Sequence, residues 1–384
     1  MTREGMNLKT GPGYVWVDDA QALARLTEAL RGVSRVGLDT EADSLHHYFE
    51  KVCLIQLSFS GSNYIVDPLA GLSLTEFLAE LSRKELILQG ADYDLRMMKQ
   101  SFGFRPEAPV FDTMLAAQVL GYEQIGLAAL AEKFCGVTLA KAGQKSDWSK
   151  RPLPVKLLEY AASDVNCLER IADGMTDELR RLARTEWHRE CCERVVKVTG
   201  LPEREEGKDP WRIKGSSKLL PKTLAFVREI WKWREEEARE RDRPPFMILL
   251  NENLIALAEW RVSNPGTPLC GGPAFLRRVT GERLSRLENA VRFAENLPPS
   301  AWPERLKRTW APDGRPSQEK VEALIAACRT IAEGLKISPS FLAPRAALTA
   351  VVRQEARSAD AVMTASGLMR WQTELVMPAV KTVL

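Results

Sequence analysis

The stretch VGLDTEADSL, Val36–Leu45, places three acids two residues apart directly after a short apolar run. On an extended strand, side chains two residues apart point to the same face, so Asp39, Glu41 and Asp43 would lie together if the strand ran through all three. Carboxylates at that spacing repel one another and resist ionisation. The stretch therefore predicts a strand that ends in an acidic cluster. It also raises two questions: what offsets the repulsion, and whether all three acids take part.

Strand and helix patterns alternate on both sides of this stretch in the first half of the chain. The predicted strands are Tyr14–Val17, Arg35–Thr40, Lys51–Ser60, Asn63–Asp67 and Glu85–Gln89. The predicted helices are Asp19–Leu30, Leu74–Arg83, Asp92–Phe102, Phe111–Gly121, Gly126–Cys135 and Pro154–Arg184. Two of the strands are adjacent and form a hairpin through Gly61-Ser62. This order predicts an α/β domain in which helices flank a mixed sheet.

The second half of the chain is almost wholly helical in pattern. A polar segment rich in Gly, Pro and charge, around residues 185–215, predicts a linker. Beyond it, apolar residues recur at helical spacing. The predicted helices there are Pro221–Arg241, Glu252–Arg261, Gly281–Glu295, Ser317–Leu335 and much of Arg345–Met369. Because the Pro/Gly-rich segment Pro298–Pro316 interrupts them, we expect two all-α lobes.

Composition restricts the class of protein. The 384 residues are 45% hydrophobic and 27% charged, as in globular proteins with real cores. The N-terminus has no apolar segment of a secretory signal and no run is long enough for a transmembrane helix, which predicts a cytoplasmic protein without membrane contact. Seven cysteines without metal-binding spacing predict reduced thiols. Three histidines leave little material for a histidine-based zinc site or a Ser-His-Asp triad.

The net charge of +3 is unevenly distributed along the chain. Residues 1–184 carry a net charge of −4, whereas residues 185–384 carry +7. This asymmetry favours cation-dependent chemistry in the first half and polyanion binding in the second. The excess is modest, and many domains that bind no polyanion match it.

Four carboxylates and a phenol fall where a mixed sheet opens a cleft, at strand ends and helix starts. Asp39 and Glu41 end a strand, Asp94 begins a helix after a strand, and Tyr160 and Asp164 lie four residues apart on one helix face. Mg²⁺ prefers carboxylate and phosphate oxygens, and two such ions about 3.5–4 Å apart can clamp a phosphodiester. The pattern therefore predicts metal-dependent phosphodiester chemistry.

Several nearby residues leave alternatives open. Asp92 could cap the helix as well as Asp94 could, and Asp112 and Asp147 fit local caps better than ligands. Gln56, a polar residue in an apolar strand, either joins a buried network or reaches the substrate. His46, His47 and Tyr48 fit a solvated loop and Trp231 and Trp233 a helical core, although each group could contact a nucleotide.

Four segments resemble the exonuclease motifs of the ribonuclease D family, in the DEDDy superfamily, in the right order over roughly residues 14–184. They are DTEADSLHHYFEKVCLIQLS, LQGADYDL, FDTMLAAQVLG and DWSKRPLPVKLLEYAASDV. The segment KTLAFVREIWKWREEEARERDRPPFMILLNENLIALAE resembles an HRDC domain. The resemblance implies three domains: a ribonuclease H-like exonuclease domain at residues 1–200, an HRDC domain at 213–297 and a second, diverged HRDC-like domain at 316–384.

The resemblance also implies roles for five residues, two divalent metal ions (Mg²⁺ or Mn²⁺) and a reaction. Asp39 would bridge both ions, Glu41 and Asp164 would bind the ion that holds the attacking water, and Asp94 would serve the second ion. Tyr160 would orient the water. The implied activity is that of a 3′→5′ exoribonuclease that releases nucleoside 5′-monophosphates.

The implied substrate is RNA with a single-stranded 3′ end, above all tRNA precursors, and the implied state is a monomer. Asp43 falls two residues beyond the first motif and is predicted to point away from the metals or to cap the following loop. Gln89 stands where the family commonly has histidine. A DNA 3′→5′ exonuclease and a catalytically inactive nucleic-acid-binding module are the alternatives.

Overall fold

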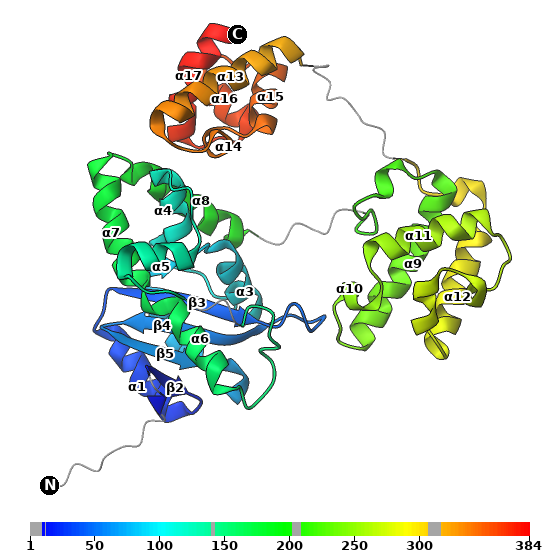
Figure 1. Ribbon diagram of the computed structural model, residues 1–384, viewed down its shortest axis with the longest axis horizontal. Coiled ribbons are helices and arrows are strands. Elements are labelled where there is room, and N and C mark those ends of the chain that lie inside the picture. Colours follow the sequence, from blue (N-terminus) through cyan, green and yellow to red (C-terminus); the bar gives the residue numbers. More distant parts are fainter. Residues whose placement is uncertain (1–9, 12, 140–142, 202–208, 306–315) are drawn as a thin grey trace. The chain divides into compact units, whose positions relative to one another are not determined.

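The acidic strand lies inside a mixed sheet that follows the predicted α/β pattern (Figure 1). The structure, a computed structural model, describes residues 10–11, 13–139, 143–201, 209–305 and 316–384. Within these residues the sheet has seven strands in the order β1-β2-β5-β4-β3-β6-β7. The strands are β1 (Thr10–Gly11), β2 (Tyr14–Val17), β3 (Arg35–Ala42), β4 (Val52–Phe59), β5 (Ser62–Val66), β6 (Glu85–Leu88) and β7 (Val110–Asp112).

Pairing in the sheet is antiparallel around β4 and parallel elsewhere except at β1. β4 pairs antiparallel with both β3 and β5, and β1 with β2. The β2–β5, β3–β6 and β6–β7 pairs are parallel. β4 is buried along its whole length, as expected for a central strand covered on both faces.

Helices cover both faces of the sheet. They are α1 (Ala20–Arg31), α2 (Thr75–Leu81), α3 (Asp92–Phe102), α4 (Thr113–Leu120), α5 (Leu127–Cys135), α6 (Val155–Asn166), α7 (Leu168–Arg181) and α8 (Thr185–Gly200). Val36 and Leu38 of β3 face the core formed with α1, α2 and α3. α6 lies across β3, β4 and β5 on the opposite face (Figure 1). Gly37 lies on the α6 face, where a Cβ would stand 2.5 Å from Oγ of Ser58 and 3.2 Å from the Cβ of Leu168, so the absence of a side chain lets the start of α7 approach β3.

The structure differs from the sequence-based expectations at several places, including the following three. The helix expected over Phe111–Gly121 begins as strand β7, because this segment pairs with β6 before α4 starts. The helix expected over Pro154–Arg184 is interrupted at Cys167, between α6 and α7. The linker expected at 185–215 begins as helix α8, whose buried face packs on β7 and α4. Residues 202–208 of that linker lie outside the described residues.

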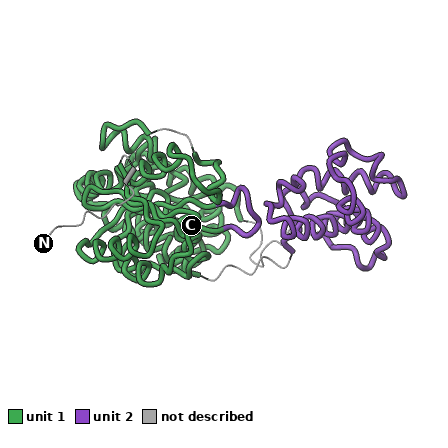
Figure 2. The backbone as a smooth tube through the Cα atoms, turned by 90° about the horizontal axis from the view of Figure 1, so that it is seen from below, with its two compact units in different colours: residues 1–42, 51–201, 310–384 green, residues 43–50, 202–309 purple. Residues whose placement is uncertain are grey.

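The chain divides into two compact units, shown in Figure 2: residues 1–42, 51–201 and 310–384 form unit 1, and residues 43–50 and 202–309 form unit 2. The last helices of unit 1 are α13 (Gln318–Leu335), α14 (Pro339–Leu342), α15 (Arg345–Arg353), α16 (Ala359–Ser366) and α17 (Arg370–Val383). They share one hydrophobic core with α4, α5, α7 and α8. The indoles of Trp187 and Trp371 stack there with ring centroids 4.8 Å apart. The domain boundaries drawn from the sequence stay a prediction.

Unit 2 contains a helical core of its own. Its helices are α9 (Pro221–Glu240), α10 (Pro245–Ile248), α11 (Asn251–Ser263) and α12 (Glu282–Glu295). Trp233 is buried in this core and Trp231 packs against it, as the helical spacing predicted. No helix within the described residues combines the length and the apolar character that crossing a membrane requires.

Candidate active site

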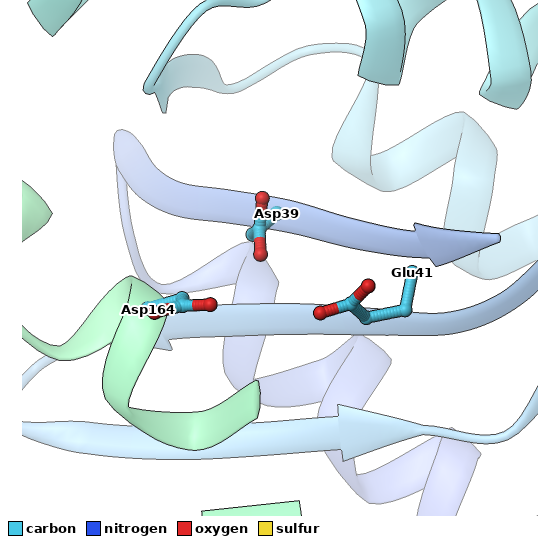
Figure 3. A group of neighbouring side chains, drawn as sticks. All are labelled: Asp39, Glu41 and Asp164. Atoms are coloured by element: carbon cyan, nitrogen blue, oxygen red, sulfur yellow. The ribbon is translucent and has the colours of Figure 1, made fainter. Parts of the chain in front are cut away.

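Three carboxylates converge on the α6 face of the sheet. Asp39 and Glu41 project from β3, two residues apart, and Asp164 projects from α6 (Figure 3). One oxygen from each of the three groups lies within 4.8 Å of the others. The β3–β4 register shifts directly after Glu41, and such a bulge bends a strand and ends regular pairing. The carboxylates therefore meet at the end of the regular ladder, where the sheet opens.

Tyr160 lies one helical turn before Asp164 on α6. Its ring stacks near Trp148, with centroids 6.3 Å apart, and Trp148 is buried. Gly143 approaches the Tyr160 ring so closely that a Cβ on Gly143 would lie 2.7 Å from a ring carbon. The phenol is therefore held in place by packing, on the face of α6 that carries Asp164.

Asp94 lies in the first turn of α3 and is bound to the acidic strand. One carboxylate oxygen of Asp94 accepts hydrogen bonds from the hydroxyl of Thr40 at 2.6 Å and from its main-chain N–H at 3.1 Å. Asp94 is buried, whereas Asp92 is exposed and forms an ion pair with Arg96. The structure thus brings Asp94, and not Asp92, to the site. The role of Thr40 had not been predicted, although its place between two acids is a visible signal.

The four carboxyl groups titrate well above their ordinary range. Burial is the largest cause that raises the pKa of Asp39, and repulsion by Asp94, Glu41 and Asp164 raises it further. Burial and then repulsion by Asp164 and Asp94 raise the pKa of Glu41 to about 8. Burial also raises the pKa of Asp94 to about 7 and that of Asp164 to about 6, although hydrogen bonds to both carboxylates oppose the rise. Ionising all four groups therefore costs free energy unless cations neutralise them.

The carboxylates line an open cavity of about 760 Å³. Its other lining residues include Tyr160, Tyr93, Gln89, Gln124 and Gln144. A cavity of this size lies in the range of small-ligand pockets, about 300–1,000 Å³.

Gln89, at the family's histidine position, is bound on both sides. Its Nε2 donates to the carbonyl of Ile125 at 2.8 Å, and its Oε1 accepts from the hydroxyl of Thr113 at 2.5 Å. The side chain therefore joins the start of α4 to the loop before α5, which also lines the cavity.

Asp112 is a buried acid that orders the main chain around Asp94. Its carboxylate caps α4 by accepting from the N–H groups of Met114 and Leu115, as predicted. The same carboxylate also accepts from the N–H groups of Gly90, at 3.0 Å, and Ala91, at 2.8 Å. These two residues form the turn that leads into α3, so Asp112 fixes the path of the chain toward Asp94.

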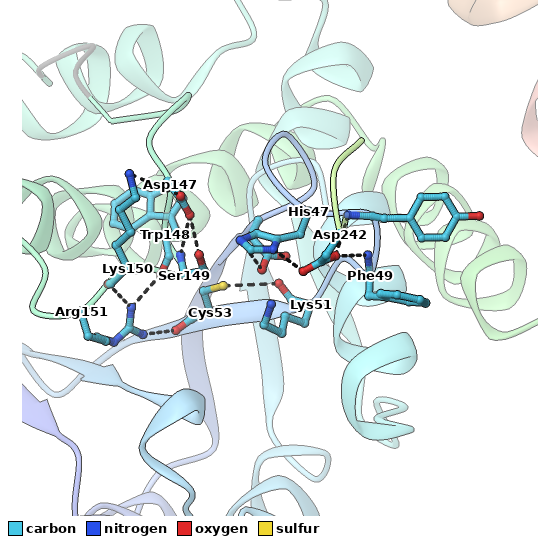
Figure 4. Close-up of polar contacts among 12 residues, drawn as sticks. His47, Phe49, Lys51, Cys53, Asp147, Trp148, Ser149, Lys150, Arg151 and Asp242 are labelled. Atoms are coloured by element: carbon cyan, nitrogen blue, oxygen red, sulfur yellow. Dashed lines mark hydrogen bonds and ion pairs between the residues drawn. The ribbon is translucent and has the colours of Figure 1, made fainter. Parts of the chain in front are cut away.

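Arg151 organises the segment before α6, a role that the sequence reasoning missed. Its guanidinium binds both oxygens of Asp67 at 2.7 Å. It also donates to the carbonyls of Cys53 and Trp148 at 2.9 and 2.7 Å (Figure 4). Asp147 accepts locally from Ser149, as predicted for a cap. These contacts attach the segment that contains Trp148 to β4.

The loop after the acidic strand, residues 43–50, belongs to unit 2 and is bound by Asp242. One oxygen of Asp242 accepts from the N–H groups of Tyr48 at 3.0 Å and Phe49 at 3.1 Å. The other oxygen lies 2.6 Å from Nδ1 of His47 (Figure 4). The described lining of the cavity does not include His46, His47 or Tyr48.

Asp43 lies with this loop and outside the three-carboxylate cluster. Its side chain is fully buried, and a carboxylate oxygen lies 4.0 Å from Nε2 of His47. Its main-chain carbonyl accepts from the N–H groups of His46 and His47. The third acid of the opening stretch thus belongs to the loop, as its position beyond the motif predicted.

Comparisons with known proteins agree with this geometry. Residues 14–180 match a 3′-5′ exonuclease family and residues 223–266 match the HRDC domain family. Ribonuclease D of Haemophilus influenzae is 33% identical over 348 residues, which cover 85% of each chain. Ribonuclease D of Pseudomonas paraeruginosa is 29% identical over 90% of each chain.

Solved structures give the same relationship. The structure of Escherichia coli RNase D, described as an exoribonuclease involved in structured RNA processing, has a TM-score of 0.71 and 26% identity. The match covers 97% of this chain and 99% of the E. coli chain. A protein from Bifidobacterium adolescentis has a TM-score of 0.80 and 25% identity over 97% of this chain.

Proposed function

The chain belongs to the ribonuclease D family and is a 3′→5′ exoribonuclease, and we propose that Asp39, Glu41, Asp94 and Asp164 hold the two divalent metal ions of its active site. The exonuclease family uses divalent metal ions as cofactors. The donor set supports the assignment, because carboxylate oxygens are the ligands that Mg²⁺ and Mn²⁺ prefer. The single observation that carries the proposal is the convergence of three carboxylates within 4.8 Å.

The raised pKa values support the same assignment. A buried acidic cluster without histidine or cysteine suits a hard cation, since its charges repel and are poorly solvated. Bound by these residues, two divalent ions would lower the pKa of the attacking water and neutralise charge on the scissile phosphate.

Tyr160 positions the attacking water by hydrogen bonding and does not act as a base. Burial and the neighbouring Asp164 raise the pKa of its phenol above the ordinary value of 10, so the hydroxyl stays protonated at neutral pH. A protonated phenol can donate to Asp164 and still accept from water. Asp164 in turn keeps the hydroxyl oriented toward the carboxylate cluster.

The substrate that we propose is the single-stranded 3′ end of a structured RNA, with tRNA precursors as the natural class. The cavity volume suits a terminal nucleotide in an unpaired strand, and the 3′-terminal phosphodiester would be hydrolysed to release a nucleoside 5′-monophosphate. The basic second half of the chain would contact phosphates of the RNA body, so binding should weaken with salt. We further propose that the protein acts in the cytoplasm, where its seven free cysteines would stay reduced, and that it acts as a monomer.

The decisive experiment compares Asp39→Asn with Asp43→Asn on a labelled RNA in Mg²⁺ and in Mn²⁺. Loss of residues that merely support metal ligands costs about 10–100-fold in activity, so Asp39→Asn should lower kcat by more than about a hundredfold. Asp43→Asn should stay within about twofold, because its carboxylate lies outside the cluster. Near-normal activity of Asp39→Asn would refute the metal assignment.

The substrate proposal needs a separate assay. Matched RNA and DNA oligonucleotides with free 3′ ends test the sugar preference, since only RNA offers a 2′-hydroxyl. A precursor tRNA with a 3′ trailer, compared with the same RNA annealed to a complementary strand over the trailer, tests the need for a single-stranded end. Equal rates on the two tRNA substrates would contradict the proposed mode of recognition.

A further inference from the structure

Gln56 is a buried carboxamide in the middle of the central strand β4. Its side chain is fully buried, and neither Oε1 nor Nε2 has a hydrogen-bond partner within the part of the chain that the structure describes. Burying polar atoms without hydrogen bonds is costly, and native proteins tend to retain such groups for a reason.

The register of the sheet places this carboxamide beside the proposed metal site. Gln56 pairs with Asp39 across the antiparallel β3–β4 ladder, so the two side chains point to the same face at neighbouring positions. Ser58, two residues further along β4, shares this face, and its hydroxyl donates to the carbonyl of Val165 in α6 at 2.7 Å. Gln56 therefore lies on the face that α6 covers, between the strand of Asp39 and the helix of Asp164.

A purely structural role does not account for Gln56. Leu54, on the same face of β4, is buried and apolar, so packing at this interface has no general need for a polar side chain. Ser58 forms the hydrogen bond that joins the strand to α6, whereas the carboxamide of Gln56 forms none that the described residues reveal. Direct contact with substrate is also excluded, because the side chain is fully buried and does not line the cavity.

We propose that Gln56 is a positioning residue for the hydrolytic site: its carboxamide donates through Nε2 to the carboxylate of Asp39 in the metal-loaded enzyme and fixes the orientation of that ligand. The inference rests on the proposed function, because it needs Asp39 to be a metal ligand. Groups that support ligands in this way orient them and commonly change metal affinity or activity about 10–100-fold when removed. Gln56 would thus be the protein-side partner of Asp39, the first acid of the stretch Val36–Leu45.

The test replaces the carboxamide by an apolar side chain of similar length, Gln56→Met, and uses Leu54→Met as the matched control on the same strand face. We expect Gln56→Met to be at least as stable as the unaltered protein in EDTA, because two unpaired polar atoms leave the core. Its kcat should fall by about tenfold or more with KM for RNA unchanged. The Mg²⁺ concentration for half-maximal thermal stabilisation should rise by about tenfold. Leu54→Met should change neither kcat nor the Mg²⁺ concentration for half-maximal thermal stabilisation.

Two outcomes overturn the proposal. A folded Gln56→Met variant with unaltered kcat and Mg²⁺ dependence would make Gln56 an ordinary core residue. Failure of both Gln56→Met and Gln56→Leu to fold would make the carboxamide a structural necessity. Either result, obtained while Asp39→Asn is inactive, leaves the metal assignment in place, whereas an active Asp39→Asn removes the basis of both proposals.

Discussion

Thr40 donates two hydrogen bonds to a single carboxylate oxygen of Asp94, one from its hydroxyl at 2.6 Å and one from its main-chain N–H at 3.1 Å. The register of β6 with β3 ends at Gly37, three residues earlier. Asp94 therefore lies at the edge of β3 beyond the end of its pairing with β6. There its carboxylate accepts from the N–H of Thr40, which a neighbouring strand would otherwise bind. The main chain of the acidic strand thus sets the position of an acid that lies 54 residues away in sequence.

Removing the Thr40 hydroxyl should leave the Asp94 side chain less firmly oriented while keeping all four carboxylates in place. We expect Thr40→Val to lower kcat by about tenfold and the free energy of unfolding by about 1 kcal/mol, because one hydrogen bond to a buried carboxylate is lost. Initial rates on a 3′-labelled RNA and urea unfolding measure the two effects. Thr27→Val is the matched control, since buried Thr27 donates to the carbonyl of Leu23 within α1. Thr27→Val should lose a similar free energy of unfolding and keep its kcat. If Thr40→Val kept the kcat of the unaltered protein, the hydrogen bond from Thr40 to Asp94 would have no part in activity.

Stability of the metal-free protein should fall as pH rises. The folded protein holds the pKa of Asp164 at about 6, of Asp94 at about 7 and of Glu41 at about 8, above the ordinary values of 3.8 and 4.5. A carboxyl group with a raised folded-state pKa favours folding fully below its ordinary pKa, and this contribution is lost as pH rises through the folded-state pKa. Thermal unfolding in EDTA should therefore show a falling Tm between about pH 4 and pH 8.

Mg²⁺ and one variant provide the controls for that titration. Mg²⁺ should raise Tm more at pH 8 than at pH 5, because the cation competes with protons for the carboxylates. Asp39→Asn should show a shallower fall in EDTA, since it removes a carboxyl group whose own pKa is raised by burial and by its acidic neighbours. A Tm in EDTA that does not change from pH 4 to pH 8 would contradict the titration, as would an equal Mg²⁺ effect at both pH values.

The loop after the acidic strand should depend on Asp242. Because one oxygen of Asp242 accepts from the N–H groups of Tyr48 and Phe49, Asp242→Ala should accelerate hydrogen exchange at both amides by about tenfold or more. Asp209→Ala is the matched control in unit 2, where Asp209 binds Trp211 and Arg212. That variant should leave exchange in the loop unaltered. Slow exchange at Tyr48 and Phe49 in Asp242→Ala would show that other contacts hold the loop.

Local patterns in the sequence predicted the chemistry of the site better than its supports. The acids at positions 39, 41, 94 and 164 and the phenol at 160 stand in motifs whose spacing relates directly to strand and helix geometry. The residues that hold the site in place act through contacts between distant parts of the sequence. Arg151 binds Asp67, 84 residues away in sequence, and Asp112 binds Gly90, 22 residues away. Short-range periodicity therefore cannot predict these contacts.

The extra strand and the helix in the expected linker show the same limit. Residues 110–112 form too short a run to be distinguished from the helix that follows, and pairing with β6 decides their conformation. α8 carries few strongly apolar residues, yet His188, Cys191 and Cys192 are buried when it packs on β7 and α4. In both cases tertiary contacts override a weak local preference.

The sequence by itself determined the α/β class, the family and the acids that we propose as metal ligands, because alternation in strands, periodicity in helices and motif residues are all properties of neighbours along the chain. Only the tertiary structure decided that Asp39, Glu41 and Asp164 meet while Asp43 turns to the loop, and that Thr40 binds Asp94. It alone placed Gln56 beside Asp39, with no hydrogen-bond partner for its carboxamide among the described residues. The physical reason is that register, burial and hydrogen-bond satisfaction are properties of neighbours in space, which the order of residues along the chain does not specify.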